Sequence, residues 1–61
     1  MSFEQFRSEI HAKVLPLIAS EIRPGTEDAL VNDMVEFFKV NHRRIKPKEF
    51  ETILAKYRRP D

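Results

Sequence analysis

Residues 26–41 read TEDALVNDMVEFFKVN, and their apolar side chains recur at the three- and four-residue spacing of an amphipathic helix. Thr26 is suited to cap this helix, and Glu27 and Asp28 follow it at the positive end of the helix dipole. The apolar side chains cover an arc of roughly 160°, which is wide for a helix that packs on one side only. We therefore predict a central helix that is contacted on two sides.

The residues before this helix carry an apolar stripe that a proline interrupts. Pro16 has no amide to bond to the carbonyl of Ala12. The stripe therefore predicts either one kinked helix or two short helices that meet near Leu15. The turn dipeptide Pro24-Gly25 ends the segment.

The residues after the central helix form a third segment with a narrower apolar stripe. Pro47 suits the first helical position, where its missing amide costs nothing, and Ile45 and Phe50 have the spacing of a hydrophobic staple. Glu49 is placed to accept a bond from the backbone amide before the helix. The three patterns together predict an all-α fold, a small three-helix bundle in a single domain over residues 1–61, with helices at about 3–22, 27–41 and 47–58.

The expected core combines the inward positions of the three helices: Phe6, Ile10, Val14, Leu17, Ile18, Leu30, Met34, Phe37, Phe38, Phe50, Ile53 and Leu54. A chain of this length buries only roughly 60% of the surface that its unfolded form exposes. It has no Cys, which excludes disulfides and thiolate zinc sites. Apolar positions beyond the core are therefore expected to contact a protein partner or a second copy, and whether the chain is a homodimer stays open. The expected protein interface consists of Val31, Val35, Val40 and Tyr57.

Several classes of function lack the residues that they require. Ser8 and His11 lie three apart on one predicted helix, but no third group orients the imidazole, and 61 residues leave little wall for a substrate pocket. Gly25 is the only glycine, whereas phosphate-binding loops need several. One histidine with one carboxylate makes a weak metal site. We expect a non-enzymatic protein without catalytic residues, a metal, a cofactor or a small-molecule substrate.

Targeting features are also missing from the sequence. No apolar run approaches the roughly 18 residues that a membrane span needs. Residues 1–4, MSFE, lack the basic region and the apolar stretch of a secretory signal. We therefore expect no membrane contact and a cytoplasmic location.

The charges are distributed unevenly although the formal net charge is only +1. Residues 1–30 carry three basic and five acidic side chains, a net −2, whereas residues 31–61 carry eight and five, a net +3. These late basic side chains suit either the negative ends of two helices or contacts with nucleic-acid phosphates. Those that flank the third predicted helix are Arg43, Arg44, Lys46, Lys48, Lys56, Arg58 and Arg59.

Two functions from different classes are compatible with these features. The favoured one is a small non-enzymatic protein-interaction or regulatory module that acts through an apolar and charged helix surface. The alternative is nucleic-acid binding through the seven basic residues. Against that alternative, the sequence pI is near 8.1, below the value of about 9 that is typical of binding domains. Glu49 and Glu51 also place acid near the start of the third helix.

Overall fold

The computed structural model describes residues 2–60, which form three helical segments. In chain order the elements are α1 (Phe3–Glu9), the π-helix η1 (Ile10–Val14), α2 (Leu15–Ile18), α3 (Glu27–Asn41) and α4 (Pro47–Ala55). The first three follow one another without a break and form one segment. The predicted all-α, three-helix fold is therefore confirmed. None of the helices in residues 2–60 has the length and apolarity that crossing a membrane would require.

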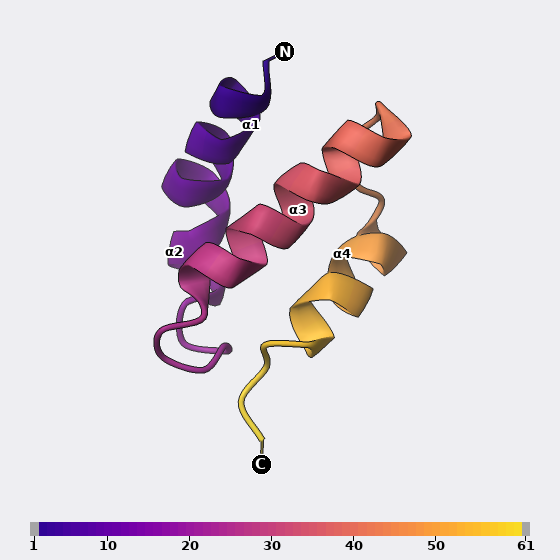
Figure 1. Ribbon diagram of the computed structural model, residues 1–61. Helices are drawn as coiled ribbons and strands as arrows, with labels where there is room; N and C mark the ends of the chain where they lie inside the picture. The colour runs from indigo at the N-terminus through magenta and orange to yellow at the C-terminus, as the bar shows by residue number, and fades with distance from the viewer. Residues whose placement is uncertain (1, 61) are drawn as a thin grey trace.

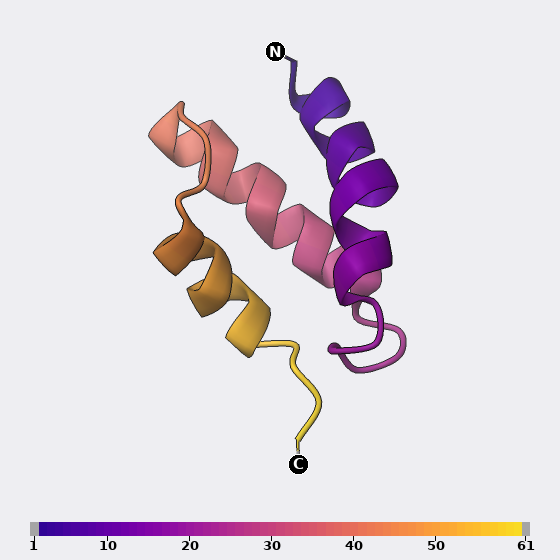
Figure 2. The same cartoon turned by 180° about the vertical axis from the view of Figure 1, so that it is seen from behind.

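The central element of the fold is α3. Both α1 and α4 pack on it, and Figures 1 and 2 show the two flanking segments on either side of α3. The prediction of a central helix that is contacted on two sides is confirmed. These two contacts within the chain cover the wide apolar face of α3.

The buried core runs along α3 and includes residues from every segment. It comprises Ile10, Ile18, Ile22, Leu30, Val31, Met34, Val35, Ile53 and Leu54. Most of the other predicted core residues are half-buried around this cluster, including Phe6, Val14 and Phe50. The prediction is therefore right for the centre of the core, whereas most of the other predicted core residues are only half-buried.

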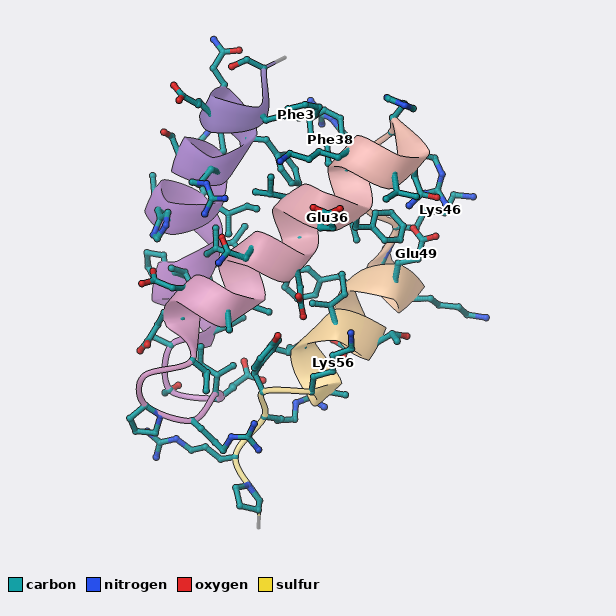
Figure 3. The ribbon with its side chains drawn as sticks, in the orientation of Figure 1. Phe3, Glu36, Phe38, Lys46, Glu49 and Lys56 are labelled. Carbon is teal, nitrogen blue, oxygen red and sulfur yellow. The ribbon has the colours of Figure 1, made fainter. Side chains whose placement is uncertain are left out.

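Aromatic side chains join α1 to the C-terminal part of α3. The ring centroid of Phe38 lies 5.5 Å from that of Phe3 and 4.7 Å from that of Phe6. Figure 3 shows Phe3 and Phe38 together in the space between the start of α1 and the C-terminal part of α3. Arg7 adds a hydrogen bond of 2.7 Å from its guanidinium to the side-chain oxygen of Asn32. These contacts hold α1 along one side of α3.

A π-helix accommodates the proline in the first segment. The amide of Leu15 donates to the carbonyl of Ile10, five residues back, so that the turn before Pro16 is wider than an α-helical turn. Pro16 occupies the second position of α2, where a missing amide is tolerated. The expected split near Leu15 thus takes the form of η1.

The same π-helix changes which residue of α2 faces the core. A π-helical turn takes up one residue more than an α-helical turn, so the inward position moves from 17 to 18. Ile18 is buried, whereas the side chain of Leu17 is 77% exposed. The prediction of Leu17 as a core residue is wrong, because it counted α-helical spacing through η1.

Helix α3 begins where it was predicted, but not by the predicted contact. The hydroxyl of Thr26 makes no capping bond to the amides of α3, and it donates instead to the carbonyl of Arg23 at 2.6 Å. Ser2 does cap α1, since its hydroxyl accepts the amide of Gln5 at 3.1 Å. Ser2 and Thr26 each directly precede a helix, but only Ser2 has the extended backbone conformation that a capping residue requires.

Two non-helical segments hold the ends of the first segment and of α4 together. Residues 21–23 and 57–59 run antiparallel, and Ile22 lies at the centre of the contact with its side chain fully buried. The amide of Arg23 donates to the carbonyl of Tyr57 at 2.8 Å, and a second backbone bond of 2.9 Å closes the other side. We call residues 57–59 the C-terminal strap.

This contact explains why two helices are shorter than predicted. The first helical segment ends at Ile18 rather than at residue 22, and α4 ends at Ala55 rather than at residue 58. The chain leaves the helical conformation after Ile18 and again after Ala55, and the residues that follow make the backbone bonds of the strap. The apolar spacing alone gave no sign of this change.

The C-terminal end of α3 contains a residue in the left-handed conformation. His42 has φ 54° and donates its amide to the carbonyl of Phe38 at 2.8 Å. Because glycine adopts this conformation without strain, we expect His42→Gly to raise the free energy of unfolding by about 0.5–1 kcal/mol. That corresponds to roughly 2–8 °C in Tm for a domain of this size, measurable by circular dichroism.

The same substitution inside α3 provides the control. Lys39→Gly replaces a helical residue of α3 and should lower stability by about 1 kcal/mol, because glycine is a poor helix former. A destabilised His42→Gly protein would contradict the role assigned to this turn.

Candidate interaction site

The four predicted interface residues occupy different environments. Val31 and Val35 are buried, with 0% and 3% of their surfaces exposed, so the prediction that they are available to a partner is wrong. The physical reason is that α1 and α4 cover both sides of α3. Val40 is 69% exposed and remains available on α3. It lies in a shallow, open depression whose lining includes the charged residues Asp33 and Glu36.

Tyr57 makes its contacts within the chain. Its hydroxyl donates to the carboxylate of Asp33 on α3, and this hydrogen bond, together with burial, raises the pKa of Tyr57. Its ring packs against the core. Tyr57 therefore fastens the C-terminal strap to α3 rather than presenting itself to a partner.

Four of the seven predicted phosphate-binding residues have partners within the chain. Arg43 donates to both carboxylate oxygens of Glu49, at 2.8 and 2.6 Å. Arg58 lies 3.0 Å from the carboxylate of Glu51, and Lys56 lies 3.8 Å from that of Asp33. The guanidinium of the fourth, Arg59, donates to a backbone carbonyl at 3.2 Å. These contacts leave fewer positive charges for a phosphate backbone than the sequence indicated.

The other three basic residues lie near the start of α4. Arg44, Lys46 and Lys48 are exposed, and within residues 2–60 their side chains form no ion pair. Figure 3 shows Lys46 beside the first turn of α4 and Lys56 at the opposite end of that helix. The structure therefore does not gather the seven residues into one patch.

Glu49 connects the loop after α3 to the first turn of α4. Its carboxylate accepts the amide of Lys46 at 2.9 Å, as predicted, and also the guanidinium of Arg43. The hydrogen bond from Arg43 is the main cause, and that from Lys46 the second, of a lowered pKa of about 2 for Glu49. Figure 3 shows this carboxylate beside Lys46.

This arrangement predicts acid sensitivity. A carboxyl whose pKa is lowered by folding stabilises the fold fully above its ordinary value of 4.5, and that contribution is lost as the pH falls towards about 2. We therefore expect Tm to fall between about pH 5 and pH 2. Glu49→Gln should lower Tm at neutral pH and make this fall smaller.

A second variant tests the cause of the shift. Arg43→Ala removes the principal hydrogen bond to Glu49, so it should also reduce the fall of Tm with acid. Circular dichroism melts over this pH range measure both effects. An unchanged acid dependence in both variants would contradict the role of Glu49.

The structure also contains an apolar cavity that the sequence did not predict. It has a volume of about 210 Å³ and lies over α3, between the first segment and the start of α4. We call it the α1–α4 groove, because its lining includes residues of the first segment and of the start of α4. It is lined by Phe6, Glu9, Ile10, Val14, Met34, Arg44, Ile45 and Phe50.

The size and lining of the α1–α4 groove limit what it can accept. Its volume is below the roughly 300–1,000 Å³ of small-molecule sites, yet above the roughly 150 Å³ that holds a benzene molecule in an engineered cavity. Six of its eight lining residues are apolar, and the two charged ones, Glu9 and Arg44, are exposed at its edges. Such a groove fits one or two apolar side chains with charged groups beside them.

The sequence carried only part of the signal for this groove. Phe6, Val14 and Phe50 were predicted as core residues, and each is half-buried because the groove remains open. Apolar spacing identifies the inward face of a helix, but it does not give the separation between two helices that flank a third. The opening therefore could not be predicted from the pattern.

The residues considered for catalysis and metal binding do not form a site with their neighbours. Ser8 lies on α1 and His11 on η1, and both are exposed. Over the described range 2–60, no three His, Asp or Glu side chains are grouped so that they would hold a metal ion.

Similarity to known proteins does not assign this chain to a family. Any functional assignment therefore depends on the chemistry of its own residues, chiefly those of the α1–α4 groove. No protein-family model, curated protein or solved structure matches the chain.

Proposed function

We propose that this protein is a small helical protein-interaction module that binds its partner in the α1–α4 groove. The observation that supports this proposal is an open cavity of about 210 Å³ with six apolar lining residues. Covering apolar surface contributes about 25 cal/mol per Å², so an apolar side chain from a partner binds favourably there. Interfaces typically draw most of their affinity from a few such anchors in pockets.

The shape of the site favours a helical partner. The first segment and α4 form the two walls of the α1–α4 groove, and Met34 of α3 lies at its floor. A helix in this position would pack on three others, as in a four-helix bundle. Amphipathic helices bind hydrophobic grooves in this way, with anchors spaced by three or four residues.

Site-specific photo-crosslinking in the native cell tests the proposal. A photoreactive residue at Lys13, which is exposed and lies close to one helical turn after the groove residue Glu9, should form covalent adducts with a bound partner. The matched control is Glu36, which lies two residues after Met34 and therefore on the opposite side of α3. Figure 3 shows Glu36 on the face of α3 that is turned to the viewer. Adducts from position 13 and none from position 36 are the expected result.

A second variant ties the adduct to the groove itself. Val14→Phe enlarges a half-buried lining residue, so it should fill part of the cavity and abolish the adduct. Circular dichroism checks that this variant is folded. Adducts that form equally from both positions, or that persist in a folded Val14→Phe protein, would contradict the proposal.

Nucleic-acid binding is the second candidate. It is supported by the basic group Arg44, Lys46 and Lys48, which forms no ion pair within residues 2–60. Titration of labelled duplex DNA at several salt concentrations tests it, because log K falls with log salt by about 0.9 per phosphate contacted. We expect binding only at low salt, with a slope no steeper than about −3 from three contacts. Tight binding at physiological salt with a slope near −6, as seven contacts would give, would favour this alternative.

A further inference from the structure

The α1–α4 groove has one acidic and one basic side chain on its opposite sides. Glu9 is the last residue of α1, and Arg44 lies in the connection between α3 and α4. Both are exposed, and neither forms an ion pair with a side chain of residues 2–60. The groove therefore favours a partner that presents the same two charges in the opposite order.

A second copy of the groove presents the charges in that order. When two copies face one another across a two-fold axis, a contact between residue i of one and residue j of the other occurs twice. Glu9 of one copy then lies opposite Arg44 of the other, and the reverse pair forms by symmetry. One orientation satisfies both charges on both copies.

Leu17 supplies an apolar side chain for the same contact. It lies eight residues after Glu9 in the same helical segment. Because the π-helix η1 takes up one residue more than an α-helical turn, these eight residues complete about two turns, which places Leu17 near the face of Glu9. At 77% it is more exposed than the other large apolar side chains that the structure describes as exposed, Phe3 and Val40. The cavity of about 210 Å³ has room for a leucine side chain from a facing copy.

We infer that the α1–α4 groove is occupied by a second copy of this chain, in a two-fold dimer that pairs Glu9 with Arg44 across the interface and covers Leu17. The inference rests on the proposed function, since it names the partner for the same groove. It also gives a role to the exposed side chain of Leu17, which the fold leaves without packing.

Sedimentation equilibrium of the full chain, from micromolar to millimolar concentration, measures the dimer directly. The expected result is a reversible equilibrium between the 7.2 kDa monomer and a species of twice that mass. Glu9→Arg and Arg44→Glu should each weaken the dimer about tenfold, because symmetry repeats each change at two contacts. Leu17→Ala should weaken the dimer while leaving the fold of the monomer intact.

A mixture of the two charge variants is the decisive sample. Glu9→Arg carries two positive charges at the groove and Arg44→Glu carries two negative charges, so each repels itself and attracts the other. We expect a heterodimer in the mixture at concentrations where neither variant alone dimerises, and recovery of the homodimer in the double variant. Glu4→Arg makes the same charge change on α1 away from the groove lining and should leave the dimer unchanged.

Two results would overturn the dimer, and they can be told apart from failure of the proposed function. A chain that remains monomeric at millimolar concentration is one, and charge variants that show neither weakening nor rescue are the other. If position 13 then crosslinks to a different protein, the groove is still an interaction site and only the identity of its occupant is wrong. If position 13 forms no adduct either, the proposed function fails as well.

Discussion

Replacing Ile22 by alanine is expected to lower the free energy of unfolding by about 2–5 kcal/mol. Ile22 lies outside the helices, yet its side chain is fully buried in the core and its backbone is paired with the C-terminal strap. Stability of 0.05–0.15 kcal/mol per residue gives about 3–9 kcal/mol for a chain of this length. The cavity that this substitution leaves therefore removes a large part of the total free energy of unfolding.

Urea unfolding followed by circular dichroism measures this loss. The control is Val40→Ala, which shortens another β-branched side chain, but one that is 69% exposed on α3. It should change stability by no more than about 0.5 kcal/mol. Similar midpoints for the two variants would contradict the burial of Ile22 as a major source of stability.

The helix starts could be predicted because their signals are local. Pro47 opens α4, and Glu49 accepts the amide that precedes α4, both as predicted. Each of these contacts joins residues that are close in sequence, so residue type and spacing carry most of the information. Thr26 is the exception, because its backbone conformation differs from that of a cap.

The positions that the sequence analysis misplaced depend on features that apolar spacing does not record. Leu17 was assigned to the core because a π-helical turn before Pro16 leaves no mark in apolar spacing. Val31 and Val35 were assigned to an interface because the pattern shows how wide an apolar face is, but not what covers it. In the structure, α1 and α4 cover it.

The α1–α4 groove and the C-terminal strap could not be predicted from apolar spacing either. The opening over Met34 depends on how far apart α1 and α4 lie on α3, and that separation is set by packing rather than by the periodicity of either helix. The C-terminal strap pairs residues 57–59 with residues 21–23, which are far apart in sequence. Apolar spacing contains no information on either arrangement.

Deleting residues 57–61 should leave the chain largely unfolded at 25 °C. The deletion removes the two backbone hydrogen bonds that join the strap to residues 21–23, each worth about 1 kcal/mol, and the packing of Tyr57, worth about 1.5–3 kcal/mol. It also exposes Ile22 to water. A loss of about 3–5 kcal/mol approaches the total stability of a domain of this size.

Two milder changes separate the contributions of the strap. Deletion of residues 60 and 61 keeps the strap and should leave the unfolding midpoint unchanged. Tyr57→Phe removes only the hydroxyl, with its hydrogen bonds to the carboxylate of Asp33 and, at 3.5 Å, to the carbonyl of Ala29, and should cost about 1–2 kcal/mol. Circular dichroism melts of the three proteins should therefore rank the full deletion as most damaging and the short deletion as least. A cooperative transition at the original midpoint after removal of residues 57–61 would show that helix packing on α3 suffices, and that the strap follows the fold instead of stabilising it.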